Sequence, residues 1–116
     1  MSFVTPLRVA ALFGFLAVAL GAFGAHGLKP ALAQHGTLAT WETGALYHLV
    51  HAAVLLALAQ REPLPRGAFV LFAAGIVIFS GSLYALALTN AKWLGAIAPI
   101  GGTSLLAGWV ALAFRR

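Results

Sequence analysis

Long apolar runs alternate with short polar breaks along this chain of 116 residues. Each run is long enough to cross the hydrocarbon core of a bilayer, which takes about 20 apolar residues in a helix. The runs are continuously apolar and do not alternate with period two, so helices are favoured over barrel strands. The pattern therefore predicts four membrane-spanning helices, over about residues 7–26, 41–60, 67–89 and 93–114.

The breaks between the runs carry residues that end helices. The first is Gly27-Leu28-Lys29-Pro30, the second is Arg61-Glu62-Pro63-Leu64-Pro65-Arg66 and the third is Asn90-Ala91-Lys92. Proline cannot donate a backbone hydrogen bond, and glycine followed by proline is a typical stop signal. Residues 31–39 are too few to span a membrane, and we expect a short interfacial helix or an ordered loop there.

The start of the second span has its own signals. Thr40 is a candidate N-cap, and Glu42 would then lie in the first turn, where the helix dipole favours an acidic side chain. Trp41 is expected at head-group depth, since tryptophan is enriched at membrane interfaces.

Composition sharpens the class of protein. Hydrophobic residues make up 62% and charged residues 8% of the chain, against roughly 45–50% and about 25% in soluble domains. A chain this short cannot bury so much apolar surface within itself, so the rest must face lipid. The expected fold is an all-α membrane protein with a single domain over residues 1–116, a compact bundle of four transmembrane helices with both termini on the same side.

Charge sets the expected partners and the orientation. The basic residues stand singly or in pairs beside the apolar runs, as membrane flanks do, so membrane lipid is the expected partner and nucleic acid is not. With four spans, the side that holds both termini carries Arg8, Arg61, Arg66, Arg115 and Arg116, and the other side carries Lys29 and Lys92. Because positive residues favour the cytoplasmic side, both termini are predicted to be cytoplasmic.

Small residues dominate the expected helix contacts. The chain has 13 glycines, and small residues let helix backbones approach closely in a membrane. Pro99 is predicted to kink the fourth helix, with Gly101 and Gly102 adding to the distortion.

The richest cluster of polar side chains lies in the second span. His48 and His51 are three residues apart, so they share a helix face, and Tyr47 lies four residues before His51. Two imidazoles are too few to hold a metal, and further ligands would have to come from His26, His35 or Glu42. The chain has no cysteine, and no metal site or cofactor is assigned.

Geometry within the helix separates the acid from the histidines. Glu42 precedes His48 by six residues and His51 by nine, on the opposite side from His51. Ser80, Ser82 and Tyr84 form a second patch of hydroxyl groups, in the third run. Serines in membrane helices usually bond to the carbonyl four residues earlier or to a neighbouring helix. The polar candidates are therefore His26, Trp41, Glu42, Tyr47, His48, His51, Ser80, Ser82 and Tyr84.

Four ordered motifs resemble the family of small membrane proteins called domain of unknown function 423. The motifs are Gly21-Ala22-Phe23-Gly24-Ala25-His26, Trp41-x-x-Gly44-x-x-Tyr47-x-x-x-His51, Leu71-Phe72 through Phe79-Ser80-Gly81-Ser82-Leu83-Tyr84-x-Leu86-Ala87-Leu88, and Pro99-x-Gly101-Gly102 with Gly108-Trp109. The resemblance implies a four-helix protein of the bacterial inner membrane, similar to a mitochondrial transmembrane family. It implies no activity. Two positions depart from the family pattern. The family usually has a hydroxyl residue where this chain has Ala98, and it often has glutamine where this chain has His48.

Three functions remain open at this point. The first is a structural or accessory bundle that self-associates or docks on a larger membrane complex, which is not an enzyme. The second is a small transporter or channel for protons, ions or small solutes, lined by His26, Tyr47 and His51. The third is a membrane enzyme or metal-binding membrane protein that uses the histidines with Glu42. The sequence favours the first, with His26, Tyr47 and His51 as a polar cluster that holds the outer ends of the first two helices together.

Overall fold

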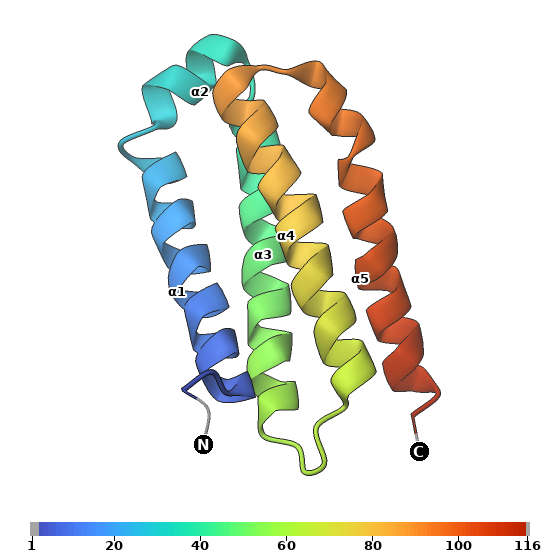
Figure 1. The fold of residues 1–116 in the computed structure, drawn as a ribbon. Helices are drawn as coiled ribbons and strands as arrows, with labels where there is room; N and C mark the ends of the chain where they lie inside the picture. The colour runs from blue at the N-terminus through green and yellow to red at the C-terminus, as the bar shows by residue number, and fades with distance from the viewer. Residues whose placement is uncertain (1–2, 116) are drawn as a thin grey trace.

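Four long helices and two short ones make up the fold in a computed structural model, which describes residues 3–115 (Figure 1). Arg116, which was counted in the orientation, lies outside the described residues. The helices are α1 (Pro6–Ala25), α2 (Lys29–His35), α3 (Leu38–Ala59), α4 (Arg66–Thr89), the 3-10 helix η1 (Lys92–Ala96) and α5 (Ala98–Ala113).

The prediction of an all-α fold with four spans is confirmed. The four segments long and apolar enough to cross a membrane are Pro6–Ala25, Leu38–Ala59, Arg66–Thr89 and Lys92–Ala113. The molecule measures 47 × 26 × 21 Å, and its long dimension matches a bilayer with its head groups, about 40–45 Å. Large apolar side chains such as Phe15, Val77 and Leu106 are exposed on its sides, as lipid-facing residues are.

Local signals explain most helix ends. The hydroxyl of Thr5 accepts a hydrogen bond from the Arg8 backbone N–H, and Pro6 occupies the first turn of α1. Asn90, with φ of 58°, ends α4 in the left-handed conformation, and Gly36 ends α2 in the same way with φ of 69°. The short helix α2 is one of the two alternatives expected for residues 31–39.

The expected start of the second span is corrected, and the distortion of the fourth span is located. The second span begins at Leu38, so its N-cap is Thr37 rather than Thr40, and Glu42 lies beyond the first turn. The hydroxyl of Thr37 donates to the Ala87 oxygen in the last turn of α4, and this contact holds the start of α3 at that point. In the fourth span the helix is interrupted before Pro99, at Ile97, and Pro99 lies in the first turn of α5. Proline needs no hydrogen-bonding partner there, so the distortion of the span falls just before Pro99 and Pro99 lies in the first turn of the helix that follows.

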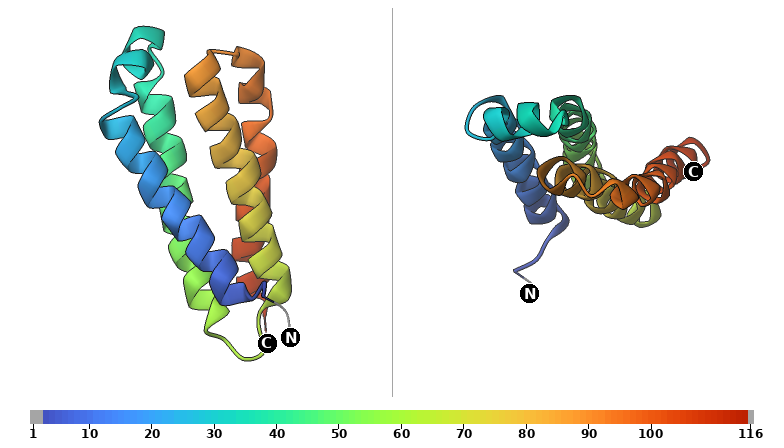
Figure 2. Two further views of the ribbon diagram at one scale, coloured as in Figure 1. Left: turned by 60° about the vertical axis from the view of Figure 1, so that its left-hand side comes forward. Right: turned by 90° about the horizontal axis from the view of Figure 1, so that it is seen from above.

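Each span packs against its neighbours in sequence (Figure 2). α1 lies on α3, α3 on α4, and α4 on α5, whereas α1 and α5 have no Cα atoms within 8 Å of each other. The same is true of α1 with α4 and of α3 with α5. Seen from above, the spans are staggered in a zigzag and do not close into a ring (Figure 2). Side chains of α3, α4 and α5 line one groove, and side chains of α1 and α4 line another.

Glycines mark the closest helix contacts. A Cβ on Gly101 would run into the backbone of Phe79 in α4, and one on Gly75 would lie 2.5 Å from Cδ2 of Leu105 in α5. Gly24 in α1 leaves room for the indole of Trp41 in α3. Gly101 and Gly75 thus let α4 and α5 approach closely, and Gly24 makes room for a side chain of α3, as the excess of glycine suggested.

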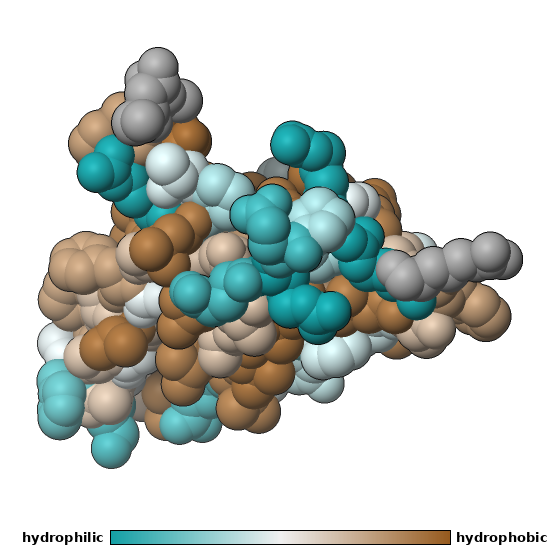
Figure 3. All heavy atoms as spheres, turned by 90° about the horizontal axis from the view of Figure 1, so that it is seen from below, coloured by the Kyte–Doolittle hydropathy of each residue, from teal (hydrophilic) through white to brown (hydrophobic). Residues whose placement is uncertain are grey.

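The start of α1, the end of α5 and the α3–α4 loop lie at one end of the molecule (Figure 1). There the Arg115 guanidinium donates to the Pro63 carbonyl. Exposed Arg8, Arg61 and Arg66 lie at the same end, where Figure 3 shows polar side chains gathered between apolar flanks.

Candidate functional site

One face of α3 forms a buried seam through the molecule. Six of its seven buried residues recur at alternating steps of three and four, namely Trp41, Gly44, His48, His51, Leu55 and Leu58, and the seventh, Ala52, is adjacent to His51. This is the spacing with which helices pack in left-handed coiled coils, where such positions are normally apolar. Here two central positions are histidines, and both are buried. Polar groups in a membrane need partners, so the contacts of these two histidines show whether they join helices or remain available for chemistry.

His48 lies at the midpoint of α3 and bonds to α4. Its Nδ1 is 2.9 Å from the hydroxyl of Tyr84. The other nitrogen, Nε2, is buried and has no hydrogen-bond partner within the described residues. The Phe13 ring meets the imidazole edge-on, with ring centroids 6.4 Å apart. One histidine therefore contacts both neighbours of α3.

His51 bonds within α3 and across to α5. Its Nδ1 lies 2.8 Å from the backbone oxygen of Tyr47, and its Nε2 lies 3.1 Å from the indole nitrogen of Trp109. An indole N–H can only donate and a carbonyl can only accept. Nδ1 must therefore carry the proton and Nε2 must be bare, so this arrangement requires the neutral Nδ1–H tautomer of His51.

Serine hydroxyl groups join α4 to α3 and α5 to α4 by donating to backbone carbonyls. Ser80 of α4 donates to the Gly44 oxygen at 2.7 Å, and Ser104 of α5 donates to the Leu71 oxygen at 2.7 Å. Ser82 bonds back to the Ile78 oxygen four residues earlier. The two predicted serine roles, across to a neighbour and back along the helix, are thus divided between Ser80 and Ser82.

Trp41 and the corner between α2 and α3 complete the set. The Trp41 indole donates to the Leu20 oxygen of α1 at 2.9 Å, and its ring lies 4.6 Å from that of Tyr84. The Thr37 hydroxyl donates to the Ala87 oxygen at 2.8 Å, and Nδ1 of His35 lies 3.3 Å from the same atom. Ala87 is in the last turn of α4, where carbonyls lack partners within the helix.

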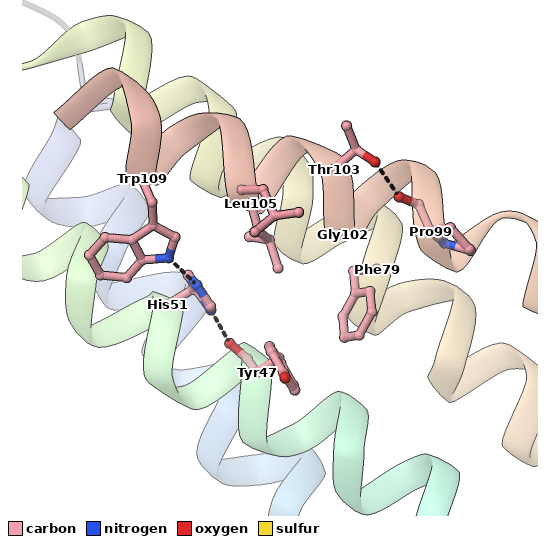
Figure 4. A pocket seen from close by; sticks show the side chains of 9 residues that line it. Tyr47, His51, Phe79, Pro99, Gly102, Thr103, Leu105 and Trp109 are labelled. Atoms are coloured by element: carbon pink, nitrogen blue, oxygen red, sulfur yellow. Dashed lines mark hydrogen bonds between the residues drawn. The ribbon is translucent and has the colours of Figure 1, made fainter. Parts of the chain in front are cut away.

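A groove opens between α3 and α5 beside His51 (Figure 4). It has a volume of about 480 Å³ and is lined by Tyr47, His51, Phe79, Pro99, Gly102, Thr103, Leu105, Leu106 and Trp109. Figure 4 shows Trp109 and His51 at one end of the groove and Pro99 and Thr103 toward the other.

Two of the polar candidates, His26 and Glu42, lie apart from the buried histidines. The backbone N–H of His26 closes the last turn of α1, its side chain is exposed, and within residues 3–115 that side chain makes no hydrogen bond. Glu42 is exposed as well, in keeping with its separation from His51. Tyr47 and His51 do stack, with ring centroids 6.1 Å apart. Within the described chain, no three His, Asp or Glu side chains come close enough to bind a metal ion together.

The site lies deeper than expected and has members that sequence reasoning missed. His48 and His51 lie near the middle of α3, because that helix begins at Leu38 and not at the expected position near residue 41. Trp109, Ser104 and Thr37 were not predicted as partners. An indole or hydroxyl in a membrane span needs an acceptor, and this rule could have singled out Trp109.

The four apolar spans and the polar bonds between them define a multi-pass helical membrane protein. The chain belongs to the family described as "Protein of unknown function (DUF423)", whose model matches residues 20–102. The family assignment made from the four motifs is thereby confirmed.

Named relatives are similar over most of their length. UPF0382 membrane protein YwdK of Bacillus subtilis is 43% identical, with 86% of this chain and 85% of that protein covered. A UPF0382 membrane protein of Haemophilus influenzae is 42% identical, with 93% and 90% covered. UPF0382 inner membrane protein YgdD of Escherichia coli is 40% identical, with 89% and 82% covered. No solved structure matches the chain.

Proposed function

We propose that this protein is a structural or accessory helix bundle of the bacterial inner membrane, which self-associates or docks on a larger membrane complex. The observation that carries the proposal is the use of the polar side chains inside the spans. Trp41, Ser80, Ser104 and both buried histidines bond one span to another. Groups engaged in this way stabilise the bundle itself, and among the described residues they leave no free nucleophile paired with a base.

A second groove supplies a surface for such contacts. It lies between α1 and α4, has a volume of about 420 Å³ and is lined by Phe13, Phe69, Val70, Ala73, Ala74, Val77 and Ile78. Every lining residue is apolar, and Ala73 and Ala74 are small. Small residues between larger apolar ones let another helix approach closely within a membrane, so this groove suits a further transmembrane helix.

The experiment is native mass spectrometry of the protein released from lipid nanodiscs. We expect an oligomer or a stable complex with other membrane proteins. Val77→Trp should lower the assembled fraction, because it fills the α1–α4 groove. Val110→Trp is the matched control, since Val110 is similarly exposed (57% against 61%) but lies outside the grooves. A lone monomer under all conditions would contradict the proposal.

We further infer that the end with Arg8, Arg61, Arg66 and Arg115 faces the cytoplasm. The opposite end has Lys29 and Lys92 as its basic residues within the described chain. This asymmetry follows the usual bias of basic residues in membrane proteins.

A further inference from the structure

The groove between α3 and α5 differs in chemistry from the one between α1 and α4. Side chains with rings line much of it, namely Tyr47, His51, Phe79 and Trp109. Its volume of about 480 Å³ falls within the range of small-molecule sites, roughly 300–1,000 Å³. Aromatic walls favour a flat ring as ligand, because rings gain from stacked and edge-on contacts at such distances.

The hydrogen-bonding groups of the groove are few and defined. Both nitrogens of His51 are engaged, so this imidazole offers only its ring face. The Thr103 hydroxyl donates to the Pro99 oxygen. Within residues 3–115 the Tyr47 hydroxyl makes no hydrogen bond, and the Tyr47 side chain is 44% exposed. In hydrocarbon, such a donor is stabilised by an acceptor oxygen on a ligand.

The depth of the α3–α5 groove in the membrane limits which lipids can place a polar oxygen beside Tyr47. Tyr47 is the tenth of the 22 residues of α3, so its Cα lies about 14 Å along a helix of about 33 Å. The groove therefore lies near the middle of the membrane. Phospholipids keep their carbonyl oxygens near the head groups, about 15 Å from the bilayer centre. A ring that carries carbonyl oxygens on an apolar tail can enter the middle.

We propose that the α3–α5 groove binds the head group of a lipid-soluble quinone. The flat ring lies among Tyr47, Phe79 and Trp109, and the Tyr47 hydroxyl donates to a quinone carbonyl. The apolar tail leaves the groove over the exposed face of Leu106. The proposal concerns binding alone and includes no electron transfer.

Gly102 provides a direct test of the groove. A Cβ there would lie 3.6 Å from the nearest atom of the Phe79 ring, which is an ordinary contact. Gly102→Leu should therefore fill the groove and leave the packing of α5 on α4 intact. Gly81→Leu is the matched control, since a Cβ on Gly81 meets nothing within 4 Å.

The experiment titrates decylubiquinone into phosphatidylcholine nanodiscs that hold the protein, with quenching of tryptophan fluorescence as the readout. The Trp93→Phe background removes an exposed tryptophan on η1. We expect saturable quenching in this background and with Gly81→Leu, and its loss with Gly102→Leu. Tyr47→Phe should weaken binding about fivefold, the effect of one neutral hydrogen bond.

Three results would overturn the proposal. The first is quenching that rises linearly without saturation, which is partition into lipid. The second is saturable quenching that Gly102→Leu leaves unchanged. The third is a Tyr47→Phe variant that binds as tightly as its parent, which decides the matter even if Gly102→Leu fails to fold.

Discussion

Trp109 donates its indole N–H to Nε2 of His51 at 3.1 Å and thereby joins α5 to α3. These two helices have no Cα atoms within 8 Å of each other. The bond spans 58 positions in sequence and lies at one end of the α3–α5 groove. It is a side-chain link between spans that do not pack directly.

Loss of this link should lower stability modestly. Trp109→Phe is expected to reduce the free energy of unfolding by about 0.5–1.5 kcal/mol, since side-chain hydrogen bonds between membrane helices contribute on this scale. Unfolding in mixed detergent micelles measures it. Trp93→Phe is the control, because Trp93 is 68% exposed on η1. Equal stability of the two variants would show that the bond contributes nothing.

The protonation state of His51 follows from its two partners. We expect nitrogen NMR of the labelled protein to show a protonated Nδ1 and an unprotonated Nε2 for this residue. A Trp109→Phe variant removes the donor and should shift the Nε2 resonance. A protonated Nε2 in the parent protein would contradict the hydrogen bond from Trp109.

The two tyrosines of the chain should respond differently to loss of the hydroxyl. Tyr84→Phe leaves Nδ1 of His48 buried without its partner, and we expect a loss of about 1–3 kcal/mol in the free energy of unfolding. Tyr47→Phe should be near neutral, because the Tyr47 hydroxyl makes no hydrogen bond within residues 3–115. Similar losses of unfolding free energy in both variants would show that the His48–Tyr84 bond does not stabilise the protein.

The adjacent glycines of α5 provide a test of close packing. Gly101→Ala should destabilise the protein by about 1–3 kcal/mol, because its Cβ would overlap the Phe79 backbone. Gly102→Ala should be neutral or stabilising by up to about 1 kcal/mol, since alanine favours the helix. Thermal unfolding of the two variants measures the difference, and the reverse order would refute this packing.

Single cysteines can test the orientation, because the chain has none of its own. Gln60→Cys lies at the arginine-rich end, and Gln34→Cys lies on α2 at the other, both at exposed positions. In intact cells that expose the periplasm, a membrane-impermeant maleimide should label position 34 and spare position 60. Labelling of position 60 instead would place the termini outside.

The apolar runs predicted the spans well because membrane insertion depends on local composition. The end of α1 and the α3–α4 loop fall where Gly27 and the two prolines of residues 61–66 suggested. The start of α3 was displaced because Thr37, rather than Thr40, meets the last turn of α4. That contact joins residues 50 apart in sequence, and no local pattern encodes it.

The polar site was predictable only in part. Spacing correctly separated Glu42 from His51, since both lie on one helix. It could not show that His48 bonds to Tyr84, or that the His26 side chain is exposed and makes no hydrogen bond to the histidine pair, because those relations depend on how different helices pack. Trp109 was missed for the same reason, although its presence in a span implied an acceptor.

The order in which the spans pack also bears on how the chain assembles. Each span rests on the one made just before it, since α1 meets α3, α3 meets α4 and α4 meets α5. The spans can therefore associate in the order of their synthesis, because no later helix has to insert between two that are already packed. The His51–Trp109 bond is the exception. It cannot form until the end of α5 has entered the membrane, so it is a contact that only the fully inserted chain can make.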